Sequence, residues 1–157
     1  MGNRPDIHYA LSSLSGKSGW GLARTHGSMF FLEFGSPISR VGQVRPHGEW
    51  HFLVELCHWR FEKPESVLVG SEADPTFIDA RFDTLKLGSV QKAEILAPSH
   101  DLMVNFSSGV SFKTFTTSRE ATDQWTQWQL FGPEQYVWIS NAGGHLQCRK
   151  RDEPVRA

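Results

Sequence analysis

Residues 49–62, with the sequence EWHFLVELCHWRFE, form the stretch that decides the fold. Trp50, Phe52 and Val54 stand at every second position, which is the period of a β-strand. Both faces of the stretch are largely apolar, so we expect a strand in the middle of a sheet. The stretch is long for a single strand, which predicts a bulge near Cys57.

The segments on both sides of this strand also have the texture of a β protein. Residues 19–34 predict a hairpin, and residues 38–48, with their glycines and a proline, predict a loop or an irregular edge strand. Further strands, separated by turn residues, are predicted at residues 66–69, 90–96, 101–106, 110–116, 125–131, 135–140 and 145–149.

Two helices interrupt this pattern. Asp6 is a typical N-cap, and residues 7–14 place their apolar side chains on one face. Asp74 followed by Pro75 marks the start of a longer helix that ends before Gly88.

The length and composition are those of one globular domain. A chain of 157 residues buries about 70% of its unfolded surface, and 39% hydrophobic with 21% charged residues is an ordinary globular composition. We expect an α+β fold over residues 1–149, followed by a flexible tail at 150–157. The fold is mostly an antiparallel sheet, curled or closed to a half-barrel, with a short N-terminal helix and one longer helix in mid-chain.

Charge and apolar runs exclude several classes of partner. Sixteen Lys and Arg against seventeen Asp and Glu leave a net charge of −1, which argues against nucleic acid. The first residues carry no signal pattern, and apolar runs such as residues 29–32 are far shorter than the ~20 residues of a membrane helix. We therefore expect a cytoplasmic monomer or homodimer, with Cys57 and Cys148 reduced.

No motif with a known mechanism occurs, whether a phosphate-binding loop, a His-Glu-x-x-His or Cys-x-x-Cys metal motif, or a Gly-x-Ser-x-Gly elbow. Cys57 as a nucleophile would need a nearby base, and His51 stands ~20 Å away along the strand. His58 after a bulge, or a histidine of another strand, is the remaining base. A small buried apolar cysteine is the better interpretation. Glu55 is expected to be a carboxylate at the rim of the sheet, paired with an arginine, rather than a general acid.

A zinc site is the other chemical alternative. His145 and Cys148 could meet Cys57 and His58 across two strands, with His51 as a further ligand. Such pairs also arise by chance, so we expect no metal and no cofactor.

The tryptophans are the most informative side chains. Trp125 and Trp128 stand three apart in one strand, so they point to opposite faces and one of them can be exposed. Exposed Trp and Tyr anchor protein interfaces, and the residues expected to contact a partner are Trp125, Trp128, Glu134 and Tyr136. Alternatively, a small molecule would bind between sheet and helix in a pocket lined by Trp50, His51, Trp59 and Phe82.

Several short segments together resemble small uncharacterised bacterial single-domain proteins, known as domains of unknown function. The segments are residues 19–21, 27–35, 50–51, 57–60 and 105–109, followed by Trp128. Some similar small α+β proteins are immunity proteins that bind and block a cognate toxin. The resemblance implies a non-enzymatic, cytosolic, protein-binding module of this kind.

Other functions stay open beside the immunity-type one. They are a small-molecule-binding β domain, an enzyme that uses Cys57 or a metal, and an oligomer-forming module joined through an exposed strand edge at residues 110–116. The near-neutral charge argues against an inhibitor of a nuclease, which would present an acidic face.

Overall fold

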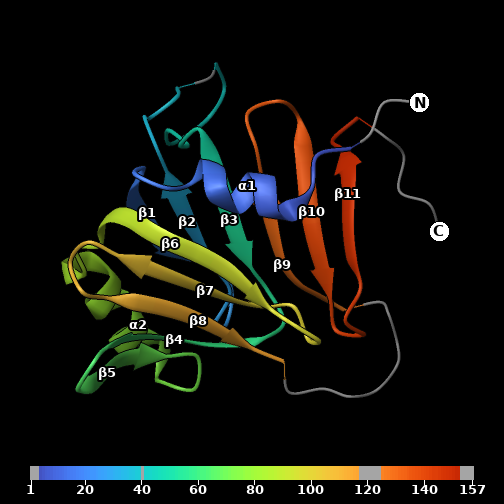
Figure 1. Cartoon of the computed structure of the whole chain (residues 1–157). Coiled ribbons are helices and arrows are strands. Elements are labelled where there is room, and N and C mark those ends of the chain that lie inside the picture. Colours follow the sequence, from blue (N-terminus) through green and yellow to red (C-terminus); the bar gives the residue numbers. More distant parts are fainter. Residues whose placement is uncertain (1–3, 40, 117–124, 153–157) are drawn as a thin grey trace.

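The computed structural model describes residues 4–39, 41–116 and 125–152. These residues form one open antiparallel sheet of eleven strands and two helices, which confirms the expected α+β fold (Figure 1). The helices are α1 (Ile7–Ser13) and α2 (Pro75–Thr84), and the strands are β1 (Ser18–Arg24), β2 (Phe30–Phe34), β3 (Trp50–Val54), β4 (His58–Lys63), β5 (Ser66–Gly70), β6 (Gly88–Leu96), β7 (Asp101–Phe106), β8 (Ser111–Phe115), β9 (Thr126–Phe131), β10 (Tyr136–Asn141) and β11 (Leu146–Lys150).

The sheet consists of two halves joined by a short pairing. The first half has the order β11-β10-β9-β3-β2-β1 and the second half the order β6-β7-β8-β4-β5. Among the described residues, the strands of the two halves pair where Ser18 and Gly19 lie opposite Ser89 and Gly88. The sheet curls at this joint, so that the inner faces of the two halves pack against each other.

Aromatic side chains fill the space between the halves. The ring of Phe30 on β2 lies 5.6 Å from that of Phe112 on β8, and 4.7 Å from that of Trp59 on β4. Phe82 of α2 packs on the same ring at 5.3 Å. The Trp59 indole N–H donates to the carbonyl of Ser28 at 2.8 Å, so this buried ring keeps a polar partner.

Helix α1 begins where the sequence predicts. The Asp6 carboxylate accepts the backbone N–H of His8 at 3.0 Å, which caps the first turn. The indole N–H of Trp138 on β10 donates to the carbonyl of Pro5 at 3.0 Å, fixing the approach to the helix. In Figure 1 this helix crosses the face of the first half.

Helix α2 also begins as predicted, with Asp74 accepting the N–H of Thr76 at 2.9 Å. It ends at Thr84, earlier than the expected stop before Gly88, because Leu85 takes an extended backbone. This extended exit buries Leu87 and leads directly into β6.

The stretch 49–62 is two strands, which corrects the expectation of one bulged strand. β3 ends at Val54 and pairs with β2 and β9 of the first half. β4 begins at His58 and pairs with β5 and β8 of the second half. Residues 55–57 therefore carry the chain from one half to the other.

The expected oligomer joint at residues 110–116 is wrong. β8 pairs with β7 on one side and with β4 on the other, so its backbone is internal to the sheet. The edges of the sheet are β5 and β11. The alternation of apolar side chains in β8 fits an internal strand and an edge strand equally well, so it could not distinguish them.

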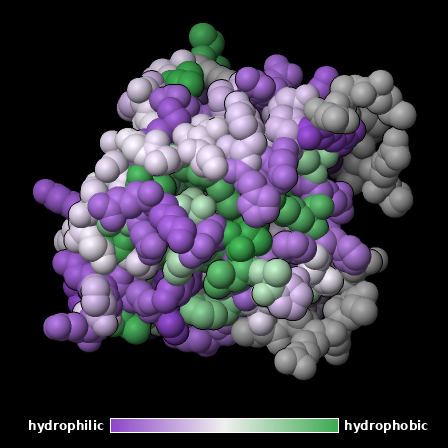
Figure 2. Space-filling view, in the orientation of Figure 1, coloured by the Kyte–Doolittle hydropathy of each residue, from purple (hydrophilic) through white to green (hydrophobic). Residues whose placement is uncertain are grey.

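The curled sheet is not closed. Figure 2 shows apolar atoms gathered in the middle of the face that it displays. Ala93 and Ile95 of β6 and Leu146 of β11 are partly buried and pack against the core. The core thus reaches the surface at these residues.

The expected flexible tail at 150–157 lies largely outside the described residues, and Lys150 is the last residue of β11. Among the described residues, no helix has the length and apolar character needed to cross a bilayer.

Candidate functional site

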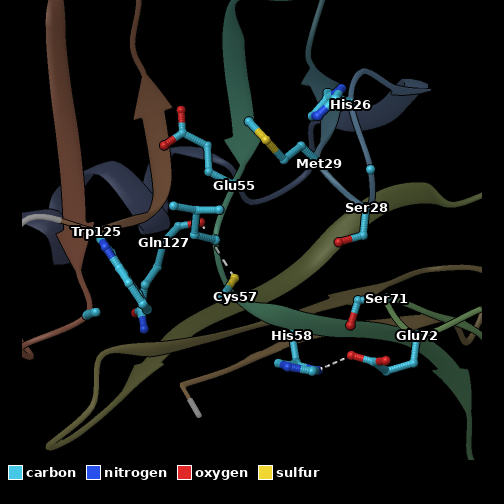
Figure 3. A pocket seen from close by; sticks show the side chains of 13 residues that line it. His26, Ser28, Met29, Glu55, Cys57, His58, Ser71, Glu72, Trp125 and Gln127 are labelled. Atoms are coloured by element: carbon cyan, nitrogen blue, oxygen red, sulfur yellow. Dashed lines mark hydrogen bonds and ion pairs between the residues drawn. The ribbon is translucent and has the colours of Figure 1, made fainter. Parts of the chain in front are cut away.

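A recess opens where the chain crosses between the two halves of the sheet (Figure 3). Its volume is about 470 Å³. We call it the Cys57 recess; it is lined by residues 26–29 of the β1–β2 turn, residues 55–58, Ser71, Glu72, Trp125, Gln127 and Ala142.

Hydrogen bonds to β9 hold the crossing segment in place. The N–H of Glu55 donates to the carbonyl of Gln127 at 2.8 Å, and the N–H of Leu56 donates to that of Thr126 at 3.2 Å. The Leu56 side chain is left 57% exposed, and that of Trp125 46% exposed. Two large apolar side chains thus stand at the mouth of the recess.

Cys57 lies at the bottom of the recess as a protonated thiol. It is buried, and its S–H donates to the Gln127 carbonyl at 3.5 Å (Figure 3). Burial, as the largest cause, and the nearby carboxylates of Asp101 and Glu55 together raise the pKa of this thiol to about 12. Since the thiolate is the reactive form, this cysteine is not activated as a nucleophile.

Two carboxylates, those of Glu55 and Glu72, lie on opposite sides of the recess. Burial raises the pKa of Glu55, and the amide of Gln129, which donates to it at 3.1 Å, acts in the opposite direction. Among the described residues, no Lys or Arg lies within ion-pair distance of Glu55. Glu72 lies across the recess with an oxygen 3.1 Å from His58 Nδ1. The rim is therefore acidic.

The expected partner-contact residues do not form one surface. Trp125 is exposed and lines the recess, whereas Trp128 is fully buried against Phe52, which corrects its assignment as a contact residue. Glu134 and Tyr136 stand beyond the opposite end of β9, ~20 Å of strand away from Trp125. Glu134 is exposed, and Tyr136 is half-buried against Trp138.

The expected aromatic pocket is filled. Trp50, Trp59 and Phe82 are buried in the core, where Trp59 and Phe82 pack with ring centroids 5.6 Å apart. His51 points to the other face of β3, toward Glu33 on β2. Alternation along β3 separates His51 from Trp50, so one cavity cannot include both.

The residues of the alternative zinc site do not meet among the described residues. Cys57 bonds to β9, His58 pairs with Glu72, and Cys148 lies on the edge strand β11. The described residues bring together one different set of metal-ligating type, Glu33, His47 and His51, whose donor atoms all lie within 4.8 Å of one another.

Sequence reasoning missed Glu33 and His47. Glu33 stands between Leu32 and Phe34 in an apolar strand, and its cross-strand position opposite His51 follows only from the observed register. His47 comes from the long connection between β2 and β3, which gives no periodic signal. The available signal was a single glutamate, Glu33, within an otherwise apolar strand, because charged side chains are rarely buried unless they are paired.

Comparisons of the chain with models of known protein families, with curated proteins and with solved structures found no match in any of the three.

Proposed function

We propose that this protein is a non-enzymatic binding protein whose Cys57 recess receives an apolar side chain of a partner protein, beside a Lys or Arg of that partner. The observation that carries the proposal is Glu55, a half-buried carboxylate that has no cationic partner among the described residues and lines the same recess as the exposed Trp125.

The apolar part of the recess supports an inserted side chain. Met29 and Cys57 line it, and Leu56 and Trp125 stand exposed at its mouth. Large apolar groups around a depression are typical of the anchoring centre of a protein interface. Burying Trp125 and Leu56 under a partner would remove from water the apolar surface that folding leaves exposed.

The acidic rim supports a cationic neighbour for that side chain. Glu55 loses much of its hydration and receives one neutral amide hydrogen bond in return. A Lys or Arg placed against it would form a charge-assisted hydrogen bond at a partly desolvated site, where such bonds are strong. Glu72 adds a second negative charge across the recess.

The chemistry of the recess favours binding over catalysis. Its thiol is held protonated, and the histidine beside it, His58, is engaged with Glu72. An activated nucleophile requires a base within hydrogen-bond reach, and Cys57 instead donates to a backbone carbonyl.

The resemblance to immunity-type proteins gives the proposal its most concrete form, in which the partner is a cognate bacterial toxin met in the cytoplasm. The net charge of −1 gives no general attraction to a basic protein. The local acidic rim supplies attraction at the recess itself.

Site-specific cross-linking tests this proposal. A photoreactive benzoylphenylalanine is introduced at Leu56, and for comparison at Val67, which is 61% exposed on the edge strand β5. We expect one protein of the source cell to be cross-linked in high yield from position 56 and not from position 67. The purified partner then gives the dissociation constants of the variants.

Trp125→Ala and Glu55→Gln are expected to raise the dissociation constant at least about 30-fold, the loss typical of an anchoring residue. Val67→Ala is expected to leave it unchanged. Equal cross-linking from both positions, or a dissociation constant insensitive to Trp125 and Glu55, would overturn the assignment of the recess.

A small apolar molecule is the second candidate, because about 470 Å³ is within the range of small-molecule pockets. Native mass spectrometry of the purified protein distinguishes the two. A bound mass that Trp125→Ala removes favours the small molecule, and a stoichiometric protein partner without such a mass favours the first proposal.

A further inference from the structure

A second cluster of chemically active groups lies outside the Cys57 recess, on the face of β2 and β3 that is turned away from the aromatic core. Glu33 and His51 are direct cross-strand partners there. The connection between the strands folds back over them and brings His47 to the same place. Three potential metal ligands thus converge from three different segments.

The local backbone is built to admit this cluster. Ile38 and His47 form an isolated antiparallel bridge, with hydrogen bonds of 2.6 and 3.1 Å, which fixes the returning end of the connection. Gly21 on β1 has a φ of +71°, and a Cβ there would lie 2.8 Å from Cγ of Glu33. The glycine leaves the room that the Glu33 side chain occupies.

The donor atoms are close to the spacing of a metal site. His51 Nδ1 lies 2.7 Å from both carboxylate oxygens of Glu33, and His47 Nδ1 lies 3.3 Å from Oε1. Tetrahedral bonds of 2.0–2.1 Å place ligand atoms about 3.3 Å apart. The His47 contact already has this spacing, and the His51 contact reaches it by opening about 0.6 Å.

The buried carboxylate of Glu33 would be stabilised by a cation. Its side chain is 1% exposed. Its oxygens accept the Gly48 N–H at 3.1 Å and lie against the rings of His51 and His47. Among the described residues, only imidazoles and no Lys or Arg lie within ion-pair distance of it. A buried carboxylate without a full positive charge beside it is costly.

We propose that Glu33, His47 and His51 bind one divalent transition-metal ion of the zinc class. Two imidazoles and a carboxylate are a donor set that suits such ions. Three protein ligands leave the fourth tetrahedral position to water, as in metal sites with an exchangeable ligand.

The fourth coordination position of the metal would face a cavity. A cavity of about 230 Å³ lies beside the cluster, and His47 and His51 form part of its wall. Phe131 and Arg151 close it on the other side, with the guanidinium 5.0 Å from the centre of the ring. The site is therefore open to water and to small ligands of the metal.

Metal titration of the untagged, chelator-treated full chain tests the proposal. With Zn²⁺ in calorimetry and Co²⁺ in visible absorption, we expect one saturable site and the intense d–d bands of four-coordinate cobalt. His47→Ala and His51→Ala are expected to weaken binding by at least about 10- to 100-fold, the loss caused even by removing an outer partner of a metal site.

The matched control is His58→Ala, which removes a histidine that is 44% exposed and pairs with Glu72 at the recess. It is expected to bind Zn²⁺ as the unchanged protein does. Circular dichroism in the presence of chelator checks that the variants fold, and His47, in a surface connection and 35% exposed, is the substitution least able to disturb the fold.

Nitrogen-15 NMR of the histidine rings identifies the ligating atoms. A Zn²⁺-dependent shift of Nδ1 in His47 and His51 supports the proposal, and a shift of Nε2 alone would overturn the three-ligand geometry. Absence of saturable binding, or equal binding by His47→Ala, would also overturn it. The cluster would then serve only to attach the β2–β3 connection to the sheet by hydrogen bonds. This outcome would not affect the proposal for the Cys57 recess.

Discussion

Gly19 and Gly88 lie opposite each other at the joint between the two halves of the sheet, and neither has room for a side chain. A Cβ on Gly19 would lie 2.7 Å from the Phe106 ring, and one on Gly88 would overlap Ser107 Oγ. A side chain at either glycine would therefore displace the Phe106 ring or the Ser107 hydroxyl group, which pack against the joint.

Gly88→Ala is predicted to destabilise the protein more than Gly109→Ala. Both glycines have positive φ, +77° and +88°, but nothing lies within 4 Å of a Cβ at Gly109. The strain of this conformation costs about 1–2 kcal/mol at either position, and the collision with Ser107 adds about 1–3 kcal/mol at Gly88. Urea denaturation measures both. Equal losses would show that the joint tolerates a side chain.

Phe30→Ala is predicted to lower the free energy of unfolding by about 3–5 kcal/mol, because it empties the centre of the aromatic core. Phe30 is fully buried and contacts the rings of Trp59, Phe82 and Phe112. Phe77→Ala, on the exposed side of α2, is the matched control and is expected to cost under about 1 kcal/mol. Chemical denaturation with a fluorescence readout compares them.

Cys57 is predicted to resist alkylation in the folded protein. A rise in its pKa from 9.0 to about 12 reduces the thiolate fraction at pH 8 by a factor of about a thousand. Mass spectrometry after iodoacetamide treatment should find residue 57 unmodified until urea unfolds the chain. Rapid labelling of native Cys57 would contradict the protonated, buried thiol.

The same shift predicts a loss of stability in alkali. The unfolded chain releases the Cys57 proton above about pH 9 and the folded protein retains it until about pH 12, so the folded state binds more protons. The free energy of unfolding therefore falls by about 1.4 kcal/mol per pH unit across this interval. Cys57→Ala removes this contribution, and the difference between the two pH profiles isolates it from other alkaline groups.

Trp125 is predicted to supply much of the tryptophan fluorescence that iodide can quench. It is 46% exposed, whereas Trp128 is fully buried. Trp125→Phe should remove most of the accessible emission, and Trp128→Phe should leave the accessible fraction unchanged. Stern–Volmer plots measure both, and a larger effect of Trp128→Phe would refute the exposures.

Local sequence signals predicted the elements better than their partners. Asp6 and Asp74 cap the helices as expected, because a cap is a contact within a few residues. The break after Val54 was missed, because apolar side chains continue on both sides of it. Alternation states which face a residue occupies, but it does not state which strand lies beside it.

The same limit applies to the two sites. Cys57 was correctly expected to be a buried thiol. One of Trp125 and Trp128 was expected to be exposed, and it is Trp125. Both expectations follow from the local sequence pattern. The Cys57 recess and the cluster around Glu33 each require strands that are distant in the chain. Only the register of β2 on β3, and of residues 55–57 on β9, brings their members together.

The position of β3 between β2 and β9 has a consequence for biosynthesis. β3 ends at Val54, but β9, which pairs with its second edge, begins only at Thr126. Most of the chain therefore leaves the ribosome before the second edge of β3 can be paired. An apolar strand with an unpaired backbone edge is a template for aggregation. Nascent chains are therefore expected to aggregate unless this edge is shielded until translation has passed β9, and products that terminate earlier are expected to be insoluble.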